Sequence, residues 1–141
     1  MSYASTTTVS VEKSRAEIDT LLGKHKASHR GIQVNEELGM AQIAFVIQGR
    51  KYRLDVPLPK ENKMELRRRY EQECRSRWRA ILLMLRAKLE LVEIGVSTVE
   101  REFLADMVLA DGQTMHIALA QAIKRGLETG EAPILALSEG T

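Results

Sequence analysis

Residues 41–59 read AQIAFVIQGRKYRLDVPLP and hold the clearest local pattern in the chain. Apolar side chains alternate with smaller or polar ones on both sides of Gly49-Arg50, and prolines end the pattern at Pro57 and Pro59. A period of two on either side of a glycine predicts a β-hairpin with one covered face and a turn at Gly49-Arg50. The side chains predicted to face the core are Ile43, Phe45, Ile47, Tyr52, Leu54 and Val56.

Upstream of the hairpin, the sequence predicts a short helix and one more strand. Ser10 is a suitable N-cap for a helix that runs to Leu22, and Gly23 is a suitable stop. Residues 31–34 are apolar enough for a short strand beside the hairpin. Residues 1–9 are small and polar, and we expect an extended or mobile arm there.

Downstream, a long helix is predicted from about Glu61 to Gly95. One apolar stripe follows its length, and the half from residue 80 to residue 94 is apolar almost all round. Such a half-helix must be covered on several sides, by later helices or by a second subunit. If a second subunit covers it, a two-fold dimer is the default form. The interface residues would be Leu82, Leu83, Leu91 and Ile94.

Two further helices complete the predicted fold. Ser97 with Glu100 three residues later forms a capping box, and Thr114 can cap the last helix. The order of elements is that of an α+β protein: a short N-terminal helix, a three-stranded antiparallel meander, a long helix and a small helical C-terminus. We interpret residues 10–141 as one domain.

Composition places the chain among soluble globular proteins. It is 44% hydrophobic and 28% charged, and it has no apolar run long enough to cross a bilayer. Cys74 is the only cysteine, so no internal disulfide can form. With no signal peptide at its start, we expect the protein in a reducing cytoplasm.

Charge is distributed unevenly. Residues 60–79 contain eight Lys/Arg and four Asp/Glu, whereas residues 80–141 contain five and nine. Basic residues gather on one face of the long helix, in the linker before the first strand and at the hairpin tip. A helix, a linker and a turn that converge could follow a phosphate backbone without reading bases. The residues predicted to bind nucleic acid or another anion are Arg68, Arg75, Arg79, Arg50, Lys51, Arg53, Lys26 and Arg30.

Salt bridges are the structural alternative for these arginines. Glu71 precedes Arg75 by four residues, and Glu90 follows Arg86 by four. Each such helix pair contributes only about 0.2–0.5 kcal/mol, too little to explain the whole cluster. Trp78 lies on the apolar stripe and is interpreted as a core residue.

Catalysis has little support. Asp55, followed by Glu61 and Lys63, loosely imitates the carboxylate and lysine set of metal-dependent nucleases, but prolines separate the two acids. His25 and His29 are four residues apart without a third ligand nearby. We expect a non-catalytic protein with no metal site and no cofactor.

Four segments together resemble a family of small proteins from tailed phages and prophages: TTVSVEKSRAEI, AFVIQGRKYRLDVPLP, CRSRWRAILLMLRAKLELVEIG and EFLADMVLADGQT. The resemblance spans nearly the whole chain. It implies a phage accessory protein made in the cytoplasm of the host cell, and it brings no established activity with it.

The sequence therefore leaves three functions open. The first is binding of nucleic acid through the basic helix and hairpin tip, largely without sequence specificity. The second is antagonism of host defence, with an arginine-lined pocket that holds a phosphate-bearing nucleotide or meets a host protein. The third is a structural or assembly role through the apolar half-helix.

Overall fold

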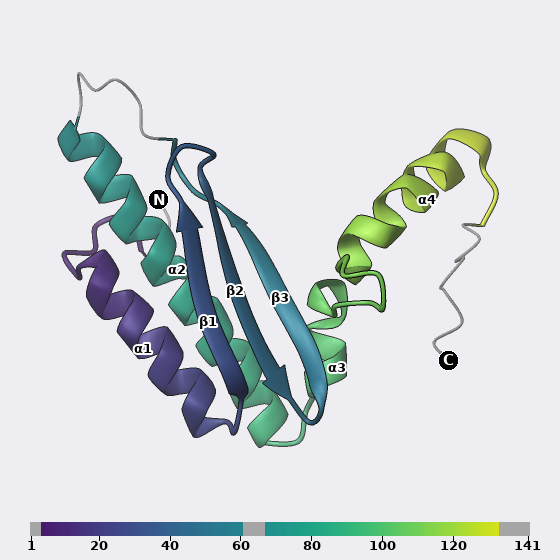
Figure 1. Ribbon diagram of the computed structural model, residues 1–141, viewed down its shortest axis with the longest axis horizontal. Coiled ribbons are helices and arrows are strands. Elements are labelled where there is room, and N and C mark those ends of the chain that lie inside the picture. The colour runs from purple at the N-terminus through teal and green to yellow at the C-terminus, as the bar shows by residue number, and fades with distance from the viewer. Residues whose placement is uncertain (1–3, 61–66, 133–141) are drawn as a thin grey trace.

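The computed structural model describes residues 4–60 and 67–132 and has the predicted α+β architecture (Figure 1). A helix, a three-stranded sheet and a long helix form one layered body, and small helices follow. In chain order the elements are α1 (Val11–Lys24), β1 (Ser28–Asn35), β2 (Met40–Ile47), β3 (Arg50–Pro57), α2 (Arg67–Glu93), α3 (Val99–Glu102), the 3₁₀ helix η1 (Leu104–Asp106) and α4 (Met115–Thr129).

The sheet is antiparallel in the order β1-β2-β3, as predicted. Phe45 pairs with Tyr52 across β2 and β3. The hairpin turn lies one residue earlier than predicted, at Gln48 and Gly49, which have φ values of 52° and 77°. Two-residue hairpin loops favour positive φ at both positions, because their twist then matches that of the strands. Arg50 is thus the first residue of β3 instead of a turn residue.

The first strand is longer than the predicted residues 31–34. It begins at Ser28, and its register shifts between Ser28 and Gly31. The added residues are polar and exposed, so hydrophobic alternation could not reveal them. Ser28 and Asn35 pair with β2, whereas His29 and Arg30 lie in the irregularity between Ser28 and Gly31.

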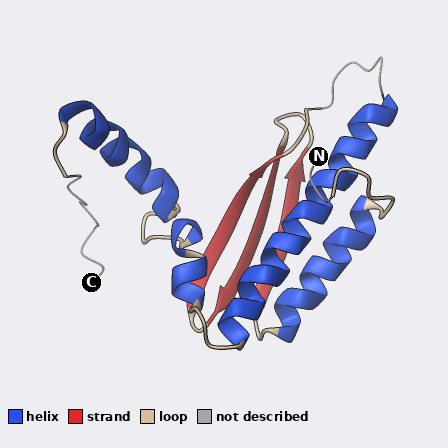
Figure 2. Ribbon diagram, turned by 180° about the vertical axis from the view of Figure 1, so that it is seen from behind, coloured by secondary structure: helices blue, strands red, loops and turns tan. Residues whose placement is uncertain are grey.

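Helices α1 and α2 lie side by side on one face of the sheet (Figure 2). Every apolar hairpin residue predicted to face the core is buried except Val56, which is partly buried. The rings of Phe45, Tyr52 and Phe103 all contact one another, with centroid distances of 5.7 Å from Phe45 to Tyr52, 5.6 Å from Phe45 to Phe103 and 6.0 Å from Tyr52 to Phe103. The two layers therefore enclose one apolar core. On its α2 side are Trp78, Ile81, Leu82, Leu85 and Leu89, here called the inner stripe.

Helix α1 begins as predicted, since the Ser10 hydroxyl accepts a hydrogen bond from the backbone N–H of Lys13. The chain just before it is already in contact with α2. Ala4 is 3% exposed, and the side-chain amide of Gln72 donates to the carbonyls of Ser5 and Thr7. The predicted start of α2 near Glu61 lies outside the described residues.

The C-terminal region differs from its prediction in two ways. The cap of α3 is Thr98, whose hydroxyl accepts from the N–H of Arg101, whereas Ser97 donates to the Glu102 carboxylate. The predicted single helix is also divided into α3 and η1. Burial of Val99 and Phe103 explains this bend, because it holds the short helix against α2 and β3.

After η1 the chain runs beside the outer edge of the sheet. Met107 forms a bridge with Tyr52, and the N–H of Val108 donates to the carbonyl of Lys51. Thr114 then caps α4 as predicted, and Gly130 ends it in the left-handed conformation. Helix α4 points away from the two layers, and none of its residues is buried (Figure 1). In the part of the chain that the structure describes, no helix is long and apolar enough to span a membrane.

Candidate interaction surfaces

The three predicted basic clusters do not converge on one surface. Ser28 pairs with Val46 and Val46 with Lys51, so the linker and the hairpin tip meet at one end of the sheet, about 10 Å apart at the usual strand spacing. His25 in the linker lies 3.9 Å from Glu93, at the C-terminal end of α2. Arg68 is at the opposite end, about 37 Å away along the helix at 1.5 Å per residue.

Helix α1 contacts the middle of the arginine face of α2 at Arg79, whereas Arg68 and Arg86 toward its two ends are exposed. Arg79 Nη1 lies 2.7 Å from Glu17 Oε2 of α1, and these side chains are 22% and 32% exposed. Arg75 donates through Nε and Nη2 to the Gln72 side-chain oxygen. Neither predicted helix pair is present among the described contacts: Glu71 pairs with Arg67 instead of Arg75, and Arg86 forms no ion pair with Glu90. These arginines hold the two helices together or brace their own helix.

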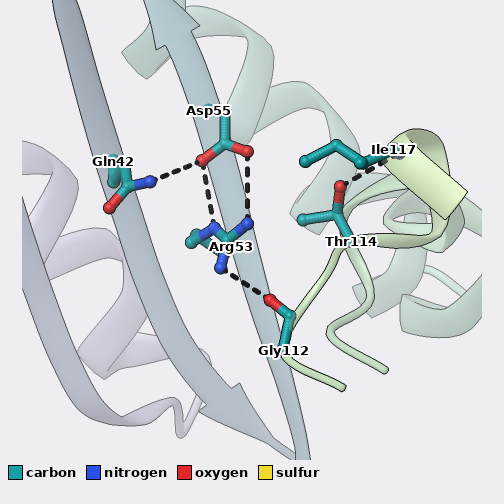
Figure 3. Close-up of polar contacts among 6 residues, drawn as sticks. All are labelled: Gln42, Arg53, Asp55, Gly112, Thr114 and Ile117. Atoms are coloured by element: carbon teal, nitrogen blue, oxygen red, sulfur yellow. Dashed lines mark hydrogen bonds and ion pairs between the residues drawn. The ribbon is translucent and has the colours of Figure 1, made fainter. Parts of the chain in front are cut away.

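Arg53 takes part in a hydrogen-bond network on the face of the sheet that α1 and α2 do not cover (Figure 3). Its Nε and Nη2 donate to the two Asp55 carboxylate oxygens at 3.0 and 3.4 Å, and its Nη1 donates to the Gly112 carbonyl at 3.0 Å. The Gln42 amide donates to the same carboxylate at 3.1 Å. The network ties β3 to the loop before α4, so Arg53 is a structural residue here.

Other predicted cations also have acidic partners. Arg30 Nε lies 2.8 Å from Asp19, whose carboxylate raises the Arg30 pKa, and Arg50 Nη2 lies 3.4 Å from Glu100. Within residues 4–60 and 67–132, ion pairs are absent for a smaller set of exposed cations. This set includes Lys24, Lys26, Lys51, Arg68 and Arg86.

A cavity of about 500 Å³ lies between α1, α2 and the end of β1. Arg15 and Arg75 line it, and the Arg15 guanidinium lies 5.5 Å from the centre of the Trp78 ring. Three carboxylates line it as well, from Glu12, Glu36 and Glu71. With more carboxylates than guanidinium groups, this cavity is poorly suited to a phosphate-bearing ligand.

Asp55, one of the residues considered for catalysis, is engaged in contacts within the sheet. Asp55 is held by Arg53 and Gln42, and the predicted partners at 61 and 63 lie outside the described residues. Burial raises the pKa of the Cys74 thiol, which lowers its thiolate fraction. Among the described residues, no group of three or more His, Cys, Asp or Glu side chains could hold a metal ion.

The predicted oligomer interface is only partly exposed. Leu82 is 0% exposed inside the core of its own chain, so it is unavailable to a partner, and Leu83 is half-buried. Leu91 and Ile94 are exposed, at 38% and 64%. Leu82 follows the helical period of the inner stripe, so its predicted place in an oligomer interface was wrong.

A second apolar stripe runs along the opposite side of α2. It consists of Ala80, Leu83, Met84, Ala87 and Leu91, here called the outer stripe, and Ile94 and Val96 continue it beyond the helix. All of these side chains except that of Leu83 are classed as exposed. The spacing of 4, 3 and 4 from Ala80 to Leu91 was present in the sequence and could have distinguished this stripe from the inner one.

No element among the described residues lies over the outer stripe. Helices α1 and α2 form the outermost layer on their side of the sheet (Figure 2). The later helices, expected as one possible cover, continue instead along the edge of β3 and away from the body (Figure 1).

Comparisons with known proteins give no relative. No family model matches the chain, and neither the curated proteins nor the solved structures contain a significant match.

Proposed function

We propose that this chain is a non-catalytic assembly protein that acts by binding another protein chain through the outer stripe of α2. The exposure of this stripe carries the proposal. Met84 and Leu91 are 37% and 38% exposed, and Ile94 and Val96 are each 64% exposed. A contiguous apolar strip on a regular helix is a common form of protein-binding surface.

Of the three functions left open, the assembly role has the most support. An arginine groove needs arginines that face a ligand, but Arg79, Arg53 and Arg30 face carboxylates of their own chain. The phosphate pocket needs excess positive charge, whereas three carboxylates and two arginines line the cavity. The outer stripe needs only a partner with an apolar surface. If the resemblance to phage proteins holds, that partner is a phage or host protein in the infected cell, or another copy of the chain.

Photo-crosslinking in the cell tests this function. A photoreactive phenylalanine analogue would replace Met84 in the outer stripe. The matched control would replace Gln33, which is exposed on β1. We expect a discrete protein adduct from position 84 and none from position 33. An unmodified chain at position 84, with the protein folded and expressed, would exclude a protein-binding role for the stripe.

A second candidate is polyanion binding at the end of the sheet where two basic clusters meet. Its specific support is that the linker and the hairpin tip, which carry Lys26 and Lys51, reach the same end of the sheet, since Ser28 and Lys51 both pair with Val46. Both lysines are exposed and unpaired among the described residues, and Lys24, the last residue of α1, comes just before the linker. Such a small site implies weak, salt-dependent binding.

Fluorescence anisotropy with single-stranded DNA, duplex DNA and RNA over a salt series tests this candidate. The triple variant Lys24→Gln, Lys26→Gln, Lys51→Gln should lose the binding. The matched variant Lys124→Gln changes an exposed lysine on α4 and should retain it. Binding that is equal in both variants would reject this end of the sheet as the site.

A further inference from the structure

We infer that the occupant of the outer stripe is a second copy of this chain, packed antiparallel about a two-fold axis close to Lys88. This inference rests on the proposed function, because it names the partner of the same surface. The shape of the stripe and the charges along its edge both favour such a pair.

The shape of the outer stripe suits another copy of the same helix. Small residues, Ala80 and Ala87, alternate with the larger Met84 and Leu91. In an antiparallel pair with its axis near residue 88, Leu91 would pack against the partner's Met84 and Ala87 would lie beside the partner's Ala87. Two alanines at the crossing point let the helix axes approach closely, and larger side chains on both sides fill the remaining space.

The ends of the stripe match in the same arrangement. Ala80 would lie opposite the partner's Ile94 and Val96, which are the most exposed apolar residues of this region, at 64% each. A small side chain at one end of the stripe thus meets large ones from the other end. The register that pairs Met84 with the partner's Leu91 also places Ala80 opposite the partner's Ile94 and Val96, so one position of the axis gives both contacts.

Charge complementarity favours the antiparallel direction. Arg86 and Glu90 lie on the same edge of the outer stripe, four residues apart, and both are exposed. Neither forms an ion pair with another described residue. About an axis near residue 88, each Arg86 would face the partner's Glu90, so the contact forms twice. In a parallel pair, this edge of one helix would face the opposite edge of the partner's stripe, so Arg86 and Glu90 would not meet each other.

The interface would be of modest size. Residues 80–94 span about 21 Å along α2 at 1.5 Å per residue, which is short for a permanent dimer. We therefore expect reversible, micromolar association, and the measurement must cover a wide range of concentration.

Sedimentation of the full chain tests the second copy. Between roughly 1 and 300 µM, a range chosen to bracket micromolar affinity, the mass should rise from 15.9 kDa toward twice that value. Leu91→Glu should keep the chain monomeric. Leu38→Glu is the matched control, since Leu38 is 68% exposed on the β1–β2 turn, and it should dimerise normally. A mass that stays at one chain throughout would overturn the second copy.

Charge reversal tests the direction. Arg86→Glu and Glu90→Arg alone should each weaken the dimer about tenfold, because each places two like-charge pairs across the axis. An equimolar mixture of the two variants should restore association through heterodimers. Single variants that dimerise as well as the wild type would overturn the antiparallel arrangement. Circular dichroism of each variant would verify that it is folded.

The failures of the two proposals are distinguishable. A chain that sediments as a monomer, but gives an adduct with a different protein from position 84, keeps the proposed function and loses the second copy. A monomer that gives no adduct loses both.

Discussion

The two stripes of α2 are both apolar and have opposite environments. Leu85 in the inner stripe is 0% exposed, whereas Leu91 in the outer stripe is 38% exposed. Both stripes repeat with helical spacing on the same helix. Periodicity therefore indicates how many faces of a helix are apolar, but it does not indicate which element covers each face.

The largest expected effect is the difference in stability between the two stripes. Leu85→Ala should lower the free energy of unfolding by about 2–5 kcal/mol, because it leaves a cavity in a closed core. Leu91→Ala should lower it by less than about 1 kcal/mol in the monomer. Urea denaturation at submicromolar protein would measure both. Equal losses would mean that the outer stripe is covered within its own chain.

A smaller effect lies on the flank between the two stripes, where Arg79 meets Glu17. A double-mutant cycle with Arg79→Ala and Glu17→Ala should give a coupling energy of about 0.5–1 kcal/mol, since both side chains are partly exposed. The coupling should shrink at high salt. Arg86→Ala paired with Glu17→Ala is the control and should give none. Without coupling in the Arg79 cycle, that arginine would again be available for a ligand.

The smallest expected effect concerns Asp106, in η1. Burial raises its pKa, and Asp55 adds to the rise, while Lys88 and His116 oppose it. The folded chain therefore holds this proton more tightly than the unfolded chain does. The contribution of Asp106 to stability is fully present below its unfolded pKa and is lost as the pH rises through the folded pKa.

Asp106→Asn removes this titration. The variant should gain stability relative to the wild type as the pH rises from about 3 to 7, across the usual carboxylate range. Thermal melts of both proteins at matched pH values would measure the difference. A constant difference in melting temperature over that range would contradict a raised pKa.

The polar contacts show which features could be predicted from the sequence and which could not. The hairpin, the long helix and the caps at Ser10 and Thr114 were predicted correctly, because each depends on residues close in sequence. The predicted cap at Ser97 was wrong by one residue. Ser97 and Thr98 both have hydroxyls that can cap a helix, and Glu100, three residues after Ser97, favoured the wrong one. Glu17, the partner of Arg79, is 62 residues away, and Gly112, whose carbonyl accepts from Arg53, is 59 residues away, so no local pattern could reveal these two contacts.

By itself, the sequence determined the class of fold and the apolar character of several sides of α2 in its second half, because alternation and helical period are local properties of the chain. Tertiary structure decided which stripe became the core and which arginines remained exposed. Those outcomes depend on α1 packing along one flank of α2 and on the chain after η1 following the edge of β3. Such placements arise from contacts between distant segments, and the free energy of the whole core selects them.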